Sequence, residues 1–181
     1  EASRILGRNK KNSVIHVHVI YLPTPSHLGE PKTKPTQLSV RTLNSMGIQP
    51  DFIVARAEKA MDARRRARFA LFCNVEPENV IDSVDLPSVY ECPVYLADQK
   101  LDEKILTMMG LPLNQIDMSK WEQMVITVKK KYVKTKTVAI VGKYFATGEY
   151  QLRDSYAALM DAIDHASWAN GVGMKVKWIQ S

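Results

Sequence analysis

The sequence predicts an α/β protein in which a parallel, doubly wound sheet is followed by the start of a second α/β domain. Three short apolar runs, at residues 13–22, 51–55 and 80–84, alternate with two helical segments. This strand–helix–strand–helix–strand order is typical of a parallel sheet with right-handed crossovers. A new apolar strand at residues 137–142 follows Lys136 and marks the second domain.

The first half of the chain has clear strand and helix signals. Residues 14–22 are almost continuously apolar, as expected for a strand that is covered on both faces. Pro35 suits the first position of the following helix, and Gly47 suits the left-handed conformation that ends a helix. Asp62 is predicted to cap the next helix, over residues 63–72.

Proline and glycine divide the middle of the chain. A helical region is predicted to start at Pro87, and Pro93 indicates a kink or a break within it. Residues 101–109 form a further predicted helix, which ends at Gly110.

The last third of the chain contains two more predicted helices. Ser119 and Glu122 form a capping box, which indicates a helix start. Asp154 is predicted to cap a later helix that stops at Gly171, and the final apolar run reads as a strand. Residues 145–151 are expected to form a loop.

A basic segment lies between the first strand and the first long helix. Lys32 and Lys34 stand near the helix N-terminus, where free backbone N–H groups and the helix dipole favour an anion. Thr36 and Gln37 add side-chain donors in the first turn. From charge alone, phosphate binding and a solvated basic loop are equally supported. Arg56, at the carboxyl end of the second strand, is either a candidate phosphate contact or a surface arginine.

The composition limits the classes of partner. The net charge of +6 favours a partner with phosphates, either a nucleotide or a nucleic acid. No apolar run approaches the ~20 residues of a membrane helix, and the first residues lack the apolar core of a secretory signal. They read as the tail of a helix, so we expect the chain to begin mid-fold. Cys73 is predicted to be a buried structural thiol. Cys73 and Cys92 lack zinc-ligand spacing and are not expected to form a disulfide. This favours a reducing, cytoplasmic compartment.

Five segments carry a resemblance to a known family. The first is Gly-Glu-Pro-Lys-Thr-Lys-Pro-Thr-Gln at residues 29–37. The others are Gly-Ile-Gln-Pro-Asp at 47–51, Ala-Leu-Phe-Cys-Asn-Val at 70–75, Trp-Glu at 121–122 and Val-Gly-Lys-Tyr at 141–144. In this order, over nearly the whole chain, they resemble the CTP synthases, the glutamine-dependent amidoligases that convert UTP to CTP.

The resemblance implies a domain organisation. Residues 1–117 would be the C-terminal part of a synthase domain with a P-loop, dethiobiotin-synthetase-like fold. Residues 118–136 would form the inter-domain linker helix, and residues 137–181 the start of a class I glutaminase-like domain. The chain therefore resembles a middle piece of such an enzyme.

The resemblance also implies binding residues. The expected UTP- and CTP-binding residues are Lys32, Thr33, Lys34, Pro35, Thr36, Gln37 and Arg68. Arg68 stands where the family usually has a lysine, and the two side chains differ in reach and geometry. The adenine of ATP would lie against the loop Val84, Asp85 and Leu86.

The reaction implied by the resemblance needs parts that this sequence does not contain. In the family, ATP phosphorylates O4 of UTP, and ammonia from glutamine displaces the phosphate. The sequence has no Gly-rich phosphate loop ending in Gly-Lys-Ser or Gly-Lys-Thr, and no cysteine after Cys92 to act as glutaminase nucleophile. The ligands for Mg²⁺ are expected outside this chain, so no catalytic residue and no metal site is assigned within it.

Partners beyond the substrates follow from the resemblance alone. GTP is expected as an effector, and the full-length enzymes are expected to form homotetramers. Neither a nucleic acid nor a membrane is an expected partner.

Two alternatives to an enzyme remain open. The chain could be a non-catalytic nucleotide-binding fragment, or a basic α/β module that binds nucleic acid. The second alternative has less support because the basic residues are not interleaved with exposed aromatic residues. Most of the arginine run at 64, 65, 66 and 68 is expected to form a solvated helix face.

Overall fold

The computed structural model describes residues 2–9, 13–25, 32–142, 146–147, 150–151 and 156–180. The chain divides into two compact units, Glu1–Trp121 and Glu122–Ser181. The division falls inside the segment 118–136, which the sequence suggests is a linker. The assignment of the two units to a synthase domain and a glutaminase domain stays a prediction.

The first unit is built on a parallel sheet of three strands, as predicted. The strands are β1 (Val17–Tyr21), β2 (Phe52–Ala57) and β3 (Val80–Val84), hydrogen-bonded in the order β1-β2-β3. All three carboxyl ends therefore lie at the same edge of the sheet, where open α/β sheets bind their ligands.

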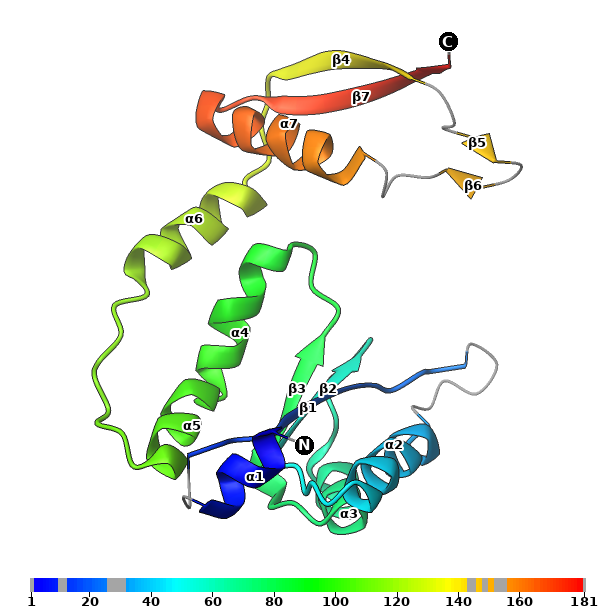
Figure 1. Cartoon of the computed structure of the whole chain (residues 1–181). Coiled ribbons are helices and arrows are strands. Elements are labelled where there is room, and N and C mark those ends of the chain that lie inside the picture. The colour runs from blue at the N-terminus through cyan, green and yellow to red at the C-terminus, as the bar shows by residue number, and fades with distance from the viewer. Residues whose placement is uncertain are drawn as a thin grey trace. The chain divides into compact units, whose positions relative to one another are not determined.

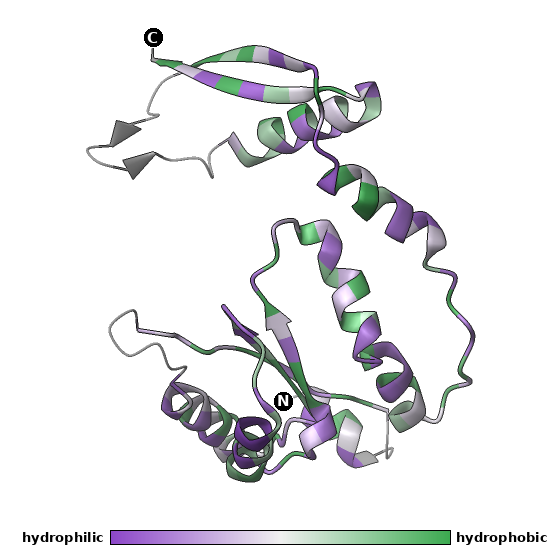
Figure 2. Cartoon of the chain, turned by 180° about the vertical axis from the view of Figure 1, so that it is seen from behind, coloured by the Kyte–Doolittle hydropathy of each residue, from purple (hydrophilic) through white to green (hydrophobic). Residues whose placement is uncertain are grey.

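Helices α2 (Lys34–Ser45) and α3 (Ala63–Cys73) lie together against one face of this sheet (Figure 1). Hydrophilic residues are prominent along both helices (Figure 2), as expected for helices that bury only one side. The main hydrophobic core lies between these helices and the sheet. Its buried members are Ile20, Leu22, Val40, Ile53, Ala55, Ala57, Met61, Phe69, Ala70, Cys73 and Val80.

The predicted starts and stops of α2 and α3 are largely confirmed. Asp62 caps α3, because its Oδ1 accepts the backbone N–H of Arg65 at 2.8 Å. Gly47 has a φ of +78°, in the left-handed region that ends helices. Helix α2 begins one residue earlier than expected, at Lys34, which leaves Pro35 in its first turn.

Beyond α3, a 3₁₀ turn (Pro77–Asn79) leads into β3, and a second one (Val89–Glu91) precedes α4 (Cys92–Asp98). The expected break near Pro93 is present but falls before it, because a proline is tolerated in the first turn of a new helix. Helix α5 (Leu101–Met109) has the predicted bounds, and Gly110 ends it with a φ of +68°. The short helix α1 (Ala2–Asn9) covers the residues that the sequence predicts to be the tail of a helix.

Helix α6 (Ser119–Lys129) contains the boundary between the two units. The predicted cap by Ser119 is wrong, because Ser119 is itself the first helical residue. Instead, the carboxylate of Asp117 accepts the backbone N–H of Ser119 at 2.9 Å. Hydrogen bonds from the side chain and then from the backbone of Ser119 lower the pKa of Asp117. Trp121 donates its indole N–H to the carbonyl of Tyr90 at 2.7 Å.

The second unit contains a parallel pair of strands, β4 (Thr135–Gly142) and β7 (Gly173–Gln180), and helix α7 (Ala157–Asn170). Gly171 ends α7 with a φ of +63°, as predicted. The expected loop at 145–151 contains two short antiparallel strands, β5 (Ala146–Thr147) and β6 (Tyr150–Gln151). The predicted cap Asp154 lies outside the described residues.

Among the described residues, no helix combines the length and the apolar character needed to cross a bilayer.

Candidate functional site

The site starts at the segment that follows β1. The backbone N–H of Lys32 donates to the carbonyl of Pro23 at 2.9 Å, which brings the segment back beside the strand end. Thr33 is the N-cap residue of α2, and its carbonyl accepts the N–H of Gln37 at 3.1 Å. The side-chain amide of Gln37 also reaches the hydroxyl of Thr33, at 3.3 Å. The first turn of α2 is thereby tied to the residue that precedes it.

A cavity of about 430 Å³ lies between this turn and α3. From the α2 side it is lined by Thr33, Lys34 and Gln37. From the α3 side it is lined by Arg65, Arg68, Phe69 and Phe72. The fold therefore brings the lysine-bearing turn and Arg68, which are far apart in the sequence, to one cavity.

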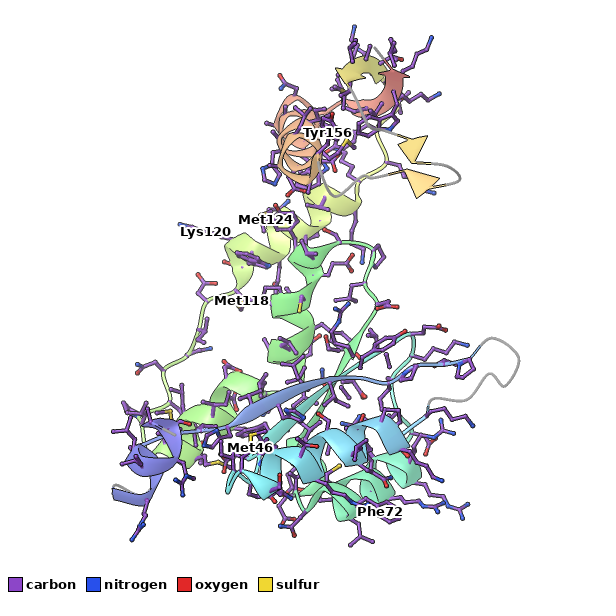
Figure 3. The ribbon with its side chains drawn as sticks, turned by 45° about the vertical axis from the view of Figure 1, so that its right-hand side comes forward. Met46, Phe72, Met118, Lys120, Met124 and Tyr156 are labelled. Atoms are coloured by element: carbon purple, nitrogen blue, oxygen red, sulfur yellow. The ribbon has the colours of Figure 1, made fainter. Side chains whose placement is uncertain are left out.

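The arginine at position 68 is held beside an aromatic ring. Its guanidinium carbon lies 5.8 Å from the ring centre of Phe72, one helical turn later on α3. Phe72 is half exposed and is labelled on α3 in Figure 3. Such a cation–π contact restrains the guanidinium without neutralising its charge. The ring therefore restrains the orientation of Arg68, whose guanidinium keeps its positive charge where it lines the cavity.

The other predicted residues of this segment have different surroundings. Pro35 is exposed, Lys32 is half-buried, and neither lines the cavity. Thr36 is only 2% exposed, and its hydroxyl has no hydrogen-bond partner among the described residues. Within this turn, the cavity is thus formed by Thr33, Lys34 and Gln37.

The sequence does not single out Arg65, Phe69 and Phe72 as cavity residues. Together with Arg68 they follow a 3-1-3 spacing, which places all four on one side of a helix. This spacing is the feature of the sequence from which Arg65, Phe69 and Phe72 could have been predicted to lie beside Arg68. The expectation of a mostly solvated arginine face is wrong for Arg66, whereas Arg64 and Arg68 are exposed and the Arg65 side chain is 35% exposed.

Arg66 points towards the sheet. Its guanidinium donates to the carbonyl of Val80 and forms an ion pair with the carboxylate of Asp82. Asp82 is 4% exposed and also accepts the backbone N–H of Met61, at 3.2 Å. On the other side, Gln99 bonds both the N–H and the carbonyl of Asp82, at 2.8 and 2.9 Å. Arg66 therefore anchors α3 to β3 and does not form part of a solvated surface.

A second group of predicted residues lies at the carboxyl ends of β2 and β3. Arg56 and Asp85 form an ion pair at 3.8 Å, with both side chains more than half exposed. The N–H of Asp85 donates to the carbonyl of Ala57 at 3.0 Å, so this N–H is already used. Val84 and Leu86 are half-buried on either side of it. The candidate phosphate contact and the candidate adenine loop are thus neighbours.

The two cysteines are unpaired. Cys73 is fully buried, and burial raises the pKa of its thiol to about 11. The prediction that Cys73 is buried is confirmed, and a thiol with so high a pKa is protonated at neutral pH and therefore a poor nucleophile. Across the described ranges, no group of three or more His, Cys, Asp or Glu residues could hold a metal ion.

Comparison with known proteins identifies the family. Residues 1–111 match the family model described as CTP synthase N-terminus. The chain is 42% identical over 171 residues to a CTP synthase of Thermococcus gammatolerans, covering 94% of this chain and 31% of the relative. It is 40% identical over 165 residues to that of Clostridium acetobutylicum, covering 91% and 30%. It is 39% identical over 182 residues to that of Pelotomaculum thermopropionicum, covering 100% and 33%.

The chain spans about a third of the length of these relatives. The family model matches more than half of the chain, and the identities near 40% extend over most of it. The chain therefore belongs to the CTP synthase family.

Proposed function

We propose that this chain supplies the UTP- and CTP-binding surface, and part of the ATP-binding surface, of an enzyme that aminates UTP to CTP. The cavity between α2 and α3 supports this proposal most directly. It combines Lys34, Arg68 and the helix N-terminus of α2 with the polar side chains of Thr33 and Gln37. This is the chemistry that a nucleoside triphosphate needs.

The proposed role of the basic residues is binding and orientation. Phosphoryl transfer depends mainly on positioning and on neutralising charge. Lys34 and Arg68 would hold the triphosphate of UTP, with Lys32 close by in sequence, so that the uracil ring is placed for reaction. When bound, ATP supplies the phosphoryl group that activates O4 of the ring.

The loop Val84, Asp85 and Leu86 is proposed to contact the adenine of ATP. The support is its location at the carboxyl edge of the sheet, next to Arg56. Because the Asp85 N–H is bonded to Ala57, the purine would use the carboxylate of Asp85 or other backbone groups of the loop.

The place of this chain in the larger enzyme is also part of the proposal. Residues 1–117 would belong to the synthase domain, 118–136 to the linker, and 137–181 to the start of a glutaminase domain. Glutamine or ammonia would supply the nitrogen, Mg²⁺ would be bound by residues outside this chain, and GTP would act as effector. The assembled enzyme would be a cytoplasmic homotetramer.

Calorimetry tests the nucleotide site. We expect Lys34→Ala and Arg68→Ala each to weaken UTP binding about tenfold or more, because each removes a charge-assisted contact to phosphate. Arg68→Lys should retain most of the affinity, since the family usually has lysine there. Lys120→Ala is the matched control, because Lys120 is an exposed lysine of α6 that does not line the cavity (Figure 3).

Two results would argue against this function. Unchanged UTP affinity in both alanine variants would show that UTP does not bind in the cavity between α2 and α3. Binding that falls steeply with salt and shows no preference for uridine nucleotides would support the nucleic-acid alternative instead.

An activity assay tests the fragment proposal. With UTP, ATP, Mg²⁺ and ammonia, we expect no CTP from this chain, because its sequence has no phosphate-loop motif. Measurable turnover would contradict this.

A further inference from the structure

Arg65 lines the cavity between α2 and α3, although it is not among the residues to which the family resemblance assigns a role. It lies on α3 one turn before Arg68, and its side chain is 35% exposed. Its guanidinium is 3.8 Å from the carboxylate of Asp62, three residues earlier. The surroundings of this ion pair indicate what Arg65 does.

The carboxylate of Asp62 has two separate tasks. Its Oδ1 accepts the backbone N–H of Arg65 at 2.8 Å, which caps α3. Its Oδ2 faces the guanidinium of the same residue at 3.8 Å, which is too long for a hydrogen bond. With 62% of the Asp62 side chain exposed, solvent screens this attraction, so the ion pair with Asp62 by itself holds the Arg65 side chain only weakly.

Among the described residues that line the cavity, positive charge predominates. Lys34, Arg65 and Arg68 line it, and no carboxylate is among the described residues that do. Arg68 rests against the ring of Phe72, and Arg65 rests against Asp62. Three cations from two helices match a polyanion that extends between them better than a single phosphate. A planar guanidinium can also bind two phosphate oxygens at once.

We propose that Arg65 is a further polyphosphate-binding residue, and that Asp62 is an internal counter-ion which it leaves when the ligand binds. This inference rests on the proposed function and deepens it. Arg65 makes the site selective for a triphosphate over a monophosphate. Asp62 weakens binding, because it competes with phosphate for the same guanidinium.

The first test compares UTP with UMP by calorimetry on the whole chain. Arg65→Gln should weaken UTP binding about tenfold or more, through loss of a charge-assisted contact, and should change UMP binding much less. Arg64→Gln is the matched control, because Arg64 is an exposed neighbour on α3 that does not line the cavity. An unchanged ratio of UTP to UMP affinity in Arg65→Gln would overturn the proposal.

The second test removes the negative charge of Asp62, so that UTP binding should become tighter and not weaker. Asp62→Asn keeps the cap, because asparagine caps helices about as well as aspartate. It removes the competing charge, so UTP should bind several-fold more tightly. The gain should disappear in the double variant Asp62→Asn/Arg65→Gln, because coupled residues are non-additive. A gain that persists in the double variant would show a general charge effect and would contradict the role of Arg65.

Inorganic tripolyphosphate separates this inference from the proposed function. If Lys34→Ala and Arg68→Ala weaken UTP binding but Arg65→Gln does not, the nucleotide site stands and the inference fails. If UTP is not preferred over other nucleotides but tripolyphosphate binding still depends on Arg65 and Asp62, the inference stands and the uridine site fails. If the wild-type chain binds neither UTP nor tripolyphosphate, both are overturned.

Discussion

Asp82 illustrates how one buried carboxylate organises its surroundings. It pairs with Arg66 from α3, accepts the N–H of Met61, and has its backbone bonded by Gln99 at the end of α4. Among the described strands β3 is at the edge of its sheet, and the amide of Gln99 satisfies backbone groups that a further strand would otherwise bond. A single position thus joins two helices to the sheet.

Removing this carboxylate should be costly. Asp82→Ala leaves the half-buried guanidinium of Arg66 without its counter-ion and removes the acceptor of the Met61 N–H. We expect the free energy of unfolding to fall by about 3 kcal/mol, measured by urea denaturation. Arg64→Ala, on the exposed side of the same helix, should change it by less than about 0.5 kcal/mol. An equal loss of unfolding free energy in the two variants would contradict the prediction that the ion pair between Asp82 and Arg66 stabilises the fold.

His18 should make stability depend on pH. Burial lowers the pKa of His18 below its ordinary value of 6.5. The unfolded chain therefore takes up this proton at a higher pH than the folded chain does. The contribution of neutral His18 to the free energy of unfolding is therefore fully present above pH 6.5 and is lost as the pH falls from 6.5 through the folded pKa.

Urea denaturation at several pH values measures this. The wild-type protein should lose more stability between pH 7 and pH 5.5 than His18→Gln does, whereas the difference between the two proteins should not change from pH 7.5 to 8.5. The same slope below pH 6.5 in both proteins would rule out His18 as a source of the pH dependence.

At the scale of elements, α3 separates its faces by function. Phe69 and Cys73 pack into the core, Arg66 reaches the sheet, and Arg65 and Arg68 line the cavity. The helix can hold these positions only if its first turn is well formed. Asp62 stabilises that turn through the hydrogen bond to the N–H of Arg65.

The cap of α3 gives a prediction for this element. Asp62→Ala should lower the free energy of unfolding by about 1 kcal/mol, because one helical N–H loses its acceptor. Asp62→Asn should change it by only a few tenths of a kcal/mol. Both are measurable from urea midpoints, and a large loss in Asp62→Asn would mean that charge, and not capping, is what α3 needs.

At the scale of the whole molecule, the two units differ in how much they bury. In β2, all residues except Arg56 are buried, and they belong to a layer covered by helices. In β4, by contrast, Ile140 is the one buried residue of the eight, and among the described residues of this unit β4 has β7 as its sheet partner. Isolated two-stranded pairs with little buried surface are marginally stable.

Hydrogen exchange should therefore distinguish the units. We expect the amides of β4 to exchange at least about tenfold faster than those of β2, because opening β4 exposes less apolar surface. Mass spectrometry of peptic peptides would measure this. Protection in β4 equal to that in β2 would indicate that the second unit is more stable than its burial suggests.

Local sequence signals determined much of this protein. The three strands of the first sheet, the cap at Asp62 and the stops at Gly47 and Gly110 all follow from neighbours within a few residues. The alternation of strands and helices also specified the parallel sheet, and the short motifs specified the family. Only the tertiary structure decided that Arg65 and Arg68 share a cavity with Lys34 and that Arg66 faces Asp82. The physical reason is that an arginine on a helix has the same local pattern whether it meets water, a carboxylate or a cavity. Which of these it meets depends on how the helix packs against elements far away in the chain.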